Sequence, residues 1–166
     1  LREAATGRAR LFIDLAYYTA SRKGALETLT WDRVDLAKRR ITLAEPGARS
    51  TKKRKPVVPM DKALYEAMSG AQWQTGSLAY VLTTDANIRP CFDAAARRAG
   101  LEMLPARDGR PAGRLTPHVL RHTRATHLLQ KGVAPYAVAA LLGDTVATVL
   151  RVYGHHCPDY LAEAIA

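Results

Sequence analysis

Residues 115–123 read LTPHVLRHT, and residues 151–156 read RVYGHH. Thr116 is a good helix cap, and Pro117 suits the first position of a helix that should continue to about Lys131. His118 and Arg121 then share one face beside the amino-terminal end of that helix. The partial positive charge of this end favours a bound anion. Taken singly, His118 could equally be a histidine at the edge of the core.

Helices are predicted for most of the remaining chain. The carboxy-terminal part should hold a helix at 134–142 ended by Gly143, a helix at 146–153 capped by Asp144 or Thr145, and a helical tail at 158–165. The amino-terminal part predicts helices at 8–22, 25–29, 61–68 and 92–98, a turn at 32–35, strands at 40–43, 56–59 and 80–83, and a loop at 105–114. The predicted fold class is mostly α with a small antiparallel β-sheet (α+β).

The charge of the chain favours a polyanionic partner. Its 166 residues fit one domain, and 25 Lys and Arg against 15 Asp and Glu leave a formal net charge of +10. The segment that joins the strands at 40–43 and 56–59 carries five cations among the seven residues 49–55. They are Arg49, Lys52, Lys53, Arg54 and Lys55. Double-stranded DNA is therefore the predicted partner, and an inert basic surface is the alternative.

Other classes of protein fit less well. No apolar run suggests a signal peptide or a membrane span, and Cys91 and Cys157 are too few for a disulfide framework, so a cytoplasmic protein is expected. His118 and His122 have the i, i+4 spacing of zinc-binding helices, but Val119 stands where a metalloprotease carries glutamate. Neither a metal site nor a cofactor is predicted. His122 and His127 are interpreted as packed, hydrogen-bonded helix residues.

Tyr153 is a candidate nucleophile. A phenol has a pKa of about 10, so its hydroxyl is weakly nucleophilic at neutral pH and needs cations around it. Two arginines can neutralise a phosphodiester, while a lysine and a histidine handle protons. The alternative is an amphipathic core tyrosine, which is the interpretation given to Tyr17, Tyr65, Tyr80 and Tyr136.

Several separated segments resemble the tyrosine recombinases, the family of phage-type integrases. The resemblance lies in residues 116–129, in Leu-Leu-Gly at 141–143 and in Arg-Val-Tyr at 151–153. Residues 21–35 resemble the family's first-arginine motif, and residues 51–59 resemble its catalytic-lysine hairpin. The motifs occur in the family's order along essentially the whole chain, which implies the DNA breaking-rejoining fold of the catalytic domain.

The resemblance also implies roles for individual residues. Arg22 and Arg121 would hold the scissile phosphate, and His118 would contact it and handle protons. Lys52, or alternatively Lys53, would protonate the leaving 5′ hydroxyl. Tyr153 would attack and form a 3′-phosphotyrosyl link, without nucleotide or metal.

Further expectations concern the whole protein. Residues 1–166 would be a single catalytic domain, with the family's amino-terminal core-binding domain absent from this chain. Assembly on paired sites would give a homotetramer in the nucleoid-associated cytoplasm, while the isolated fragment could be a monomer. A DNA-binding relative with impaired catalysis and a type IB topoisomerase-like enzyme are the alternatives.

Two positions depart from the family pattern. Asp144 follows Leu-Leu-Gly where the family usually has histidine, and a helix cap is the preferred interpretation of its carboxylate over a catalytic role. Ala25 lies where the family often places an acid. Glu27 is close in sequence but is expected to face elsewhere.

Overall fold

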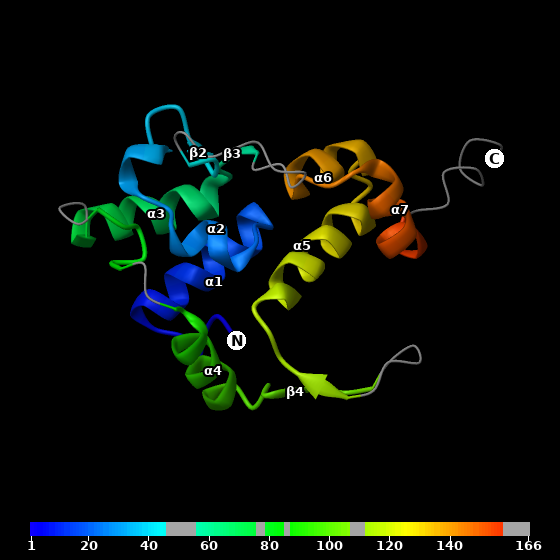
Figure 1. Cartoon of the computed structure of the whole chain (residues 1–166), viewed down its shortest axis with the longest axis horizontal. Coiled ribbons are helices and arrows are strands. Elements are labelled where there is room, and N and C mark those ends of the chain that lie inside the picture. The colour runs from blue at the N-terminus through cyan, green and yellow to red at the C-terminus, as the bar shows by residue number, and fades with distance from the viewer. Residues whose placement is uncertain (46–55, 76–78, 85–86, 107–111, 158–166) are drawn as a thin grey trace.

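Helices make up most of the computed structural model, which describes residues 1–45, 56–75, 79–84, 87–106 and 112–157 (Figure 1). The helices are α1 (Gly7–Thr19), α2 (Lys23–Glu27), α3 (Lys62–Thr75), α4 (Arg89–Arg98), α5 (His118–Gln130), α6 (Pro135–Leu142) and α7 (Val146–Tyr153), with short 3₁₀ turns η1 (Trp31–Arg33) and η2 (Gly154–His156). The strands are β1 (Val34–Asp35), β2 (Arg40–Thr42), β3 (Val57–Pro59), β4 (Met103–Leu104) and β5 (Gly113–Arg114). The predicted fold class is confirmed.

The larger sheet is antiparallel and has the order β1-β2-β3. Val34 pairs with Ile41, and Ile41 pairs with Val58, so three buried side chains line one face of the sheet. After β2 the chain leaves the sheet and returns at β3, where the Leu43 N–H donates to the Pro56 carbonyl at 3.3 Å. The basic segment therefore joins two neighbouring strands at one end of the sheet.

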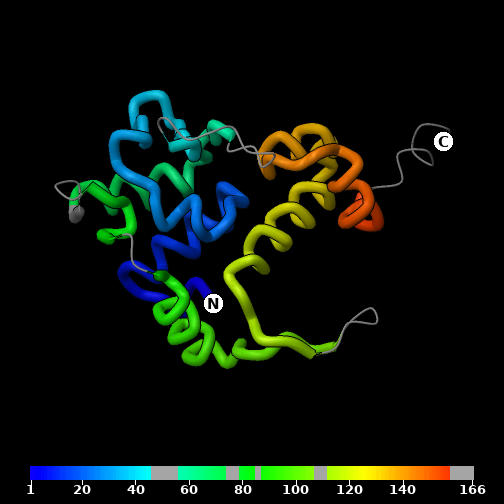
Figure 2. The backbone as a smooth tube through the Cα atoms, in the orientation of Figure 1, coloured from blue at the N-terminus to red at the C-terminus, as the bar shows by residue number. Residues whose placement is uncertain are grey.

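Two hydrophobic clusters form the interior. The first cluster is formed by helices α1, α2, α3 and α4, the larger sheet and the start of α5. It includes Phe12, Leu26, Ile41, Phe92 and Leu120. The second joins the last turns of α5 to α6 and α7, and it includes Ala125, Leu129, Val138, Leu142, Val149 and Tyr153. Helix α5 contributes to both clusters, and Figure 2 shows it, in yellow, between the blue amino-terminal helices and the orange α6 and α7. The position of α5 thus fixes how the two parts face each other.

Helix ends differ from the prediction where backbone geometry intervenes. Helix α1 ends at Thr19 rather than Arg22, because Ala20 adopts a left-handed conformation with φ 51°. The helix predicted at 61–68 continues to Thr75. Gly143, with φ 64°, ends α6 as predicted, and the Thr145 hydroxyl caps α7 by accepting the Thr148 N–H at 3.1 Å.

Three other predictions were wrong. Residues 80–83 are not a strand: Tyr80 forms one isolated bridge with Thr30, and Thr83 has φ 68°, a turn conformation. The side chain of Thr116 does not cap α5, since the first turn is closed by its carbonyl, which accepts the Val119 N–H at 3.0 Å. The predicted loop at 105–114 ends in β5, which pairs with β4.

The longest helix in the described parts of the chain is α3, with 14 residues. None of the individual helices there is long and apolar enough to cross a bilayer. The only combination with sufficient length and composition is α6 with the helical stretch Val146–His156, and these two are bent by 106° relative to each other.

Candidate active site

The turn that follows α1 positions Arg121. Ala20 is fully buried, and its left-handed backbone directs its carbonyl oxygen towards α5, where it accepts a hydrogen bond from Arg121 Nη1 at 2.7 Å. Arg121 is only 4% exposed. Burial lowers the pKa of Arg121, with the charge of Arg22 acting in the same direction and that of Asp144 opposing both. A buried, oriented guanidinium can bind an anion strongly because little water screens it.

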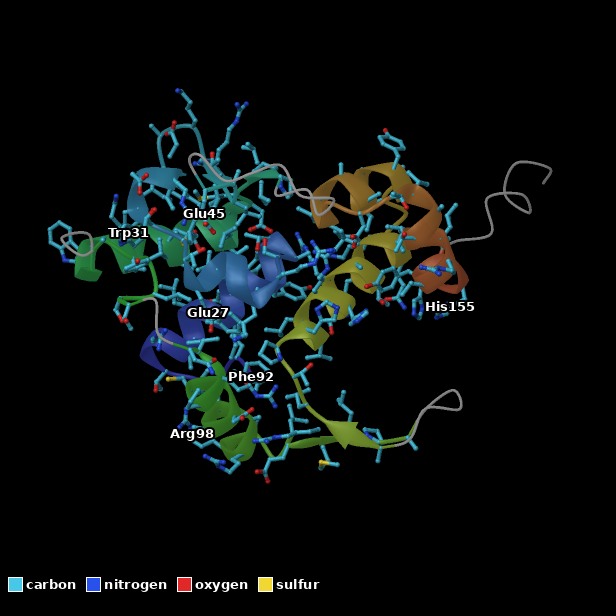
Figure 3. All side chains as sticks on the ribbon, viewed as in Figure 1. Glu27, Trp31, Glu45, Phe92, Arg98 and His155 are labelled. Atoms are coloured by element: carbon cyan, nitrogen blue, oxygen red, sulfur yellow. The ribbon has the colours of Figure 1, made fainter. Side chains whose placement is uncertain are left out.

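Arg22 reaches the same place from the other side. It lies immediately before α2, and its Nη2 donates to Asp144 Oδ1 at 2.9 Å. Arg121 Nη2 donates to the other carboxylate oxygen, Oδ2. Side chains from the two parts of the molecule meet in the space between α2 and α5 (Figure 3). The two guanidinium groups therefore converge on one anion.

The preferred interpretation of Asp144 as the cap of α7 was wrong. It was expected to cap α7, but Thr145 provides the cap and the Asp144 carboxylate turns towards the arginines. The physical reason is charge: two guanidinium groups offer a carboxylate two full positive charges, whereas a helix amino terminus offers about half of one. Asp144 thus lies where the resemblance places a phosphate-contacting side chain.

Tyr153 ends α7 and belongs to the second cluster. It is 7% exposed, and its hydroxyl lies 2.7 Å from His122 Nδ1. Burial raises the pKa of the Tyr153 hydroxyl, Arg121 opposes this rise, and Asp144 adds to it. The phenol is therefore protonated at neutral pH and lies within the electrostatic reach of the arginine pair.

His118 stands at the exposed start of α5. Desolvation lowers the pKa of His118, the positive charges of Arg121 and Arg22 lower it further, and Asp144 opposes them. Its ring packs edge-on against His122 with centroids 4.6 Å apart. Within the described ranges, no group of three His, Cys, Asp or Glu side chains could hold a metal ion.

The structure brings together four of the predicted site residues and adds one. Arg22, Arg121, Asp144 and Tyr153 form the cluster, with His118 at its edge. His122 contacts the candidate nucleophile directly, although the sequence indicated only a packed helix residue. Its one signal was the i, i+4 spacing from His118. His127, by contrast, is hydrogen-bonded as expected: its Nδ1 lies 2.9 Å from the Tyr17 hydroxyl.

The remaining predicted residues lie outside the described residues. They are the two candidate acids, Lys52 and Lys53, and the other basic residues of that segment, Arg49, Arg54 and Lys55. The strands that flank this segment are described. Thr42 pairs with Val57 at the point where the segment begins and ends.

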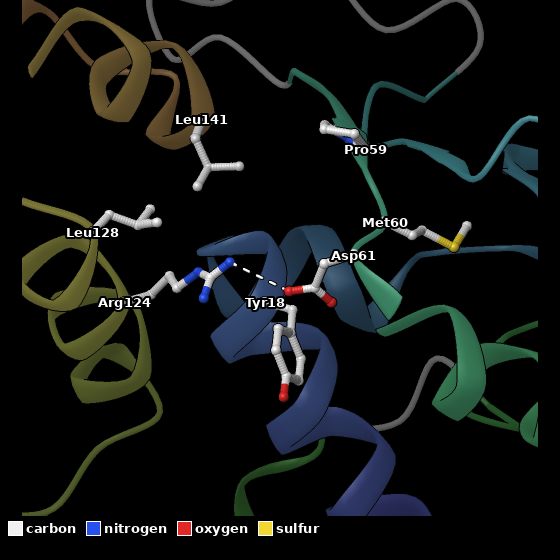
Figure 4. Close-up of a pocket in the computed structure, with 7 residues that line it drawn as sticks. All are labelled: Tyr18, Pro59, Met60, Asp61, Arg124, Leu128 and Leu141. Atoms are coloured by element: carbon white, nitrogen blue, oxygen red, sulfur yellow. Dashed lines mark ion pairs between the residues drawn. The ribbon is translucent and has the colours of Figure 1, made fainter. Parts of the chain in front are cut away.

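A separate pocket of about 290 Å³ opens between α1, the β3–α3 junction, α5 and α6 (Figure 4). It is lined by Tyr18, Pro59, Met60, Asp61, Arg124, Leu128 and Leu141. Arg124 and Asp61 form an ion pair across it at 3.6 Å. None of the clustered site residues lines this pocket, so it is distinct from the candidate active site.

The fold and this cluster define a class. A mostly helical domain in which two arginines and a histidine lie near a buried tyrosine has the fold and the site residues expected of a tyrosine recombinase catalytic domain. The sequence matches the model of the phage integrase family over residues 2–159. The chain belongs to this family, and the resemblance inferred from its motifs is confirmed.

Individual relatives agree with the family match. The integrase of Escherichia phage 186 is 31% identical over 147 residues, covering 89% of this chain and 37% of the phage protein. Tyrosine recombinase XerA of Thermococcus kodakarensis is 33% identical over 159 residues, covering 95% of this chain and 54% of XerA. The chain thus spans between a third and little more than half of these relatives.

A solved structure supports the fold. The crystal structure of a XerA recombinase superposes with a TM-score of 0.73 at 23% identity, covering 99% of this chain and 59% of that one. At this identity the likeness concerns the fold. The breaking-rejoining fold predicted from the motifs is confirmed.

Proposed function

We propose that this chain is the single catalytic domain of a site-specific DNA recombinase or integrase that cuts and rejoins strands through Tyr153. One observation carries the proposal: Arg22 and Arg121, which are 99 residues apart in sequence, bind the same carboxylate next to the tyrosine. A phosphodiester offers the same pair of anionic oxygens. Double-stranded DNA, the predicted partner, would present that group.

The proposed reaction is phosphoryl transfer. The Tyr153 oxygen attacks the scissile phosphorus, the bond from phosphorus to the 5′ oxygen breaks, and a 3′-phosphotyrosyl link remains. The arginine pair stabilises the charge that develops on the nonbridging oxygens. Guanidinium charge takes the place that metal ions take in many phosphoryl-transfer enzymes, so the proposed step is metal-independent.

The basic segment supplies the remaining parts. Lys52 is proposed as the general acid for the leaving 5′ oxygen, with Lys53 as the alternative. Arg49, Arg54 and Lys55 are proposed to contact the DNA backbone. The ends of β2 and β3 support this assignment, because they anchor the segment to the same part of the molecule as Arg22. A homotetramer on paired sites, in the nucleoid, is the proposed assembly.

A suicide DNA substrate tests the proposal. Once cut, a nicked duplex loses a short strand and cannot be rejoined, so the protein–DNA link accumulates and shifts the protein on a denaturing gel. The wild-type chain is expected to form this adduct and Tyr153→Phe to form none. An adduct that persists in Tyr153→Phe would remove Tyr153 as the nucleophile.

Asp144 favours a second candidate, a DNA-binding relative whose catalysis is impaired. Its carboxylate occupies both guanidinium groups that a phosphate would need. Under this second proposal, Asp144→His raises cleavage strongly from a low wild-type level. Robust cleavage by the wild-type chain eliminates it.

A further inference from the structure

The Tyr153 hydroxyl contacts the ring of His122. His122 lies on α5, one helical turn after His118. Tyr153 lies on α7 and is buried in the second cluster, whereas His122 lies on α5 and is half-buried. The oxygen of Tyr153 and Nδ1 of His122 are 2.7 Å apart, and the two rings are tilted by 50° with centroids 5.6 Å apart. This is the separation expected of a proton donor and its acceptor.

The resemblance gives proton handling to His118, but the ring nitrogen that lies at the Tyr153 hydroxyl belongs to His122. Tyr153 must lose its hydroxyl proton as its oxygen bonds to phosphorus, and burial makes that proton harder to remove. An imidazole protonated on Nε2 presents Nδ1 as an acceptor. We propose that His122 is a catalytic residue that accepts the proton of Tyr153. The inference rests on the proposed function and deepens it.

The order of residues on α5 allows Arg121 to bind the phosphate while His122 accepts the proton. Arg121 and His122 are consecutive, so Arg121 can point to the phosphate position beside Ala20 while His122 points to α7. His118 packs edge-on against the His122 ring and limits its rotation. One helical turn thus holds the proposed phosphate ligand and the proposed base in a fixed relation.

The step balances in both directions. In cleavage, the proton moves from the Tyr153 oxygen to His122 Nδ1 while the oxygen–phosphorus bond forms and the bond to the 5′ oxygen breaks. The 5′ oxygen receives its proton from the proposed lysine. In rejoining, the 5′ hydroxyl gives its proton to the proposed lysine and bonds to phosphorus, the phosphotyrosyl bond breaks, and His122 returns its proton to the tyrosine oxygen. His118 remains free to contact the phosphate.

His122→Phe tests the inference, since it keeps a ring in place and removes the acceptor. Single-turnover cleavage of the suicide substrate at saturating DNA is expected to fall about 100-fold or more, the usual contribution of a general base. DNA affinity should stay within about twofold, because His122 does not contact the proposed phosphate. Folding is checked by circular dichroism.

The chain offers a matched control on the same helix. His127 Nδ1 also lies 2.9 Å from a tyrosine hydroxyl, that of Tyr17, but away from the arginine pair. His127→Phe removes a tyrosine–histidine hydrogen bond at an exposed position of the same helix and is expected to cleave at the wild-type rate. An equal loss in both variants would show that the His122 contact matters only for packing, and would overturn the inference.

A fluorinated tyrosine at position 153 gives a readout that packing does not affect. Fluorine on the ring lowers the pKa of the phenol, so a base is needed less. The substitution is expected to restore cleavage in His122→Phe far more than it alters the wild-type rate. If the Phe variant does not fold, His122→Gln provides the same comparison, because its amide can bind the hydroxyl but cannot carry the proton away.

The outcomes separate the two proposals. If wild-type protein forms no adduct through Tyr153, the proposed function fails and the role of His122 fails with it. If wild type forms the adduct and His122→Phe forms it as fast or faster, only the role of His122 fails, and His122 then merely holds the hydroxyl.

Discussion

Asp144 has two opposite effects on the site around it. Its carboxylate keeps Arg22 and Arg121 oriented, but it also reduces their combined charge from two to one and occupies the position proposed for phosphate. Because like charges at about 4 Å repel by roughly 1–4 kcal/mol, depending on the surrounding dielectric, DNA must displace this carboxylate or bind beside it. The balance can be measured.

Asp144→Asn removes the charge and keeps the shape of the side chain. We expect DNA to bind about 5- to 10-fold more tightly, which corresponds to roughly 1 kcal/mol. Fluorescence anisotropy with a labelled duplex at constant salt measures this. Asp35→Asn makes the same change in net charge at the end of strand β1, outside the clustered site residues, and should alter the affinity little. Weaker binding by Asp144→Asn would mean that orienting the arginines matters more than repulsion.

His118 makes stability depend on pH. Free histidine has a pKa of about 6.5, and the folded chain holds that of His118 below this value. Between the two values the unfolded chain binds more protons, so the free energy of unfolding should fall as pH decreases through about 6.5. Urea unfolding from pH 5 to 8 measures the slope. His118→Gln should flatten it, and an unchanged slope in the variant would contradict the assignment.

Motifs predicted Arg22, Arg121, His118 and Tyr153, because each lies in a local pattern that a single segment can display. They did not predict the role proposed for His122. That role depends on the hydrogen bond between α5 and α7, whose separation and rotation are set by packing in the second cluster. The same holds for Asp144, whose carboxylate had several feasible partners in sequence.

Helix α4 is hydrogen-bonded to the segment that leads into α5, and so helps to hold that helix in place. Arg89 donates from Nη2 to the Leu115 carbonyl at 3.0 Å and from Nε to Asp93 at 2.7 Å. Asp93 also pairs with Arg114 at 2.8 Å. At the other end, Lys23 Nζ donates to Asn87 Oδ1 at 3.2 Å, so α2 is tied to the start of α4. The elements that carry Arg22 and Arg121 thus share one support.

Asp93→Asn tests this support. The Asp93 side chain is 15% exposed and bonds two arginines, so we expect a loss of about 1–2 kcal/mol in the free energy of unfolding. Glu66→Gln on α3 is the matched control, because its ion pair with Lys62 is long and exposed and should contribute almost nothing. Urea titrations of both variants give the comparison; equal losses would contradict the role of Asp93.

Element boundaries were harder to predict than element types. The helices around residues 7–19, 118–130 and 146–153 follow from apolar spacing and from Gly143, which suits the left-handed end of α6. The end of α1 could not be predicted in this way, because it depends on a positive φ at Ala20, and alanine rarely adopts this conformation. Tertiary contacts, not local preference, hold that turn.

The whole molecule places its site at a seam between two hydrophobic clusters. Arg22 comes from the first part, Tyr153 from the second, and α5 contributes to both. Strands β2 and β3, which flank the basic segment, belong to the first part. DNA that contacts both the basic segment and Tyr153 must therefore span the seam.

Salt dependence reports how many cations meet the DNA. Each phosphate neutralised contributes a slope of about −0.9 to the logarithm of affinity against that of salt concentration, so Arg54→Gln with Lys55→Gln should reduce the slope by about two. A double variant of exposed lysines elsewhere, Lys38→Gln with Lys62→Gln, should leave it nearly unchanged. Anisotropy at several salt concentrations measures both. A wild-type slope near zero would exclude the basic segment as a DNA contact.

Ala20 gives the site a form of mutational robustness. The group that holds Arg121 is a main-chain carbonyl, which no amino-acid substitution can delete. What substitution can change is the turn itself: position 20 is fully buried and left-handed, so it admits alanine or glycine and penalises β-branched residues. Variation among descendants of this chain should therefore be narrow at a residue whose side chain performs no chemistry.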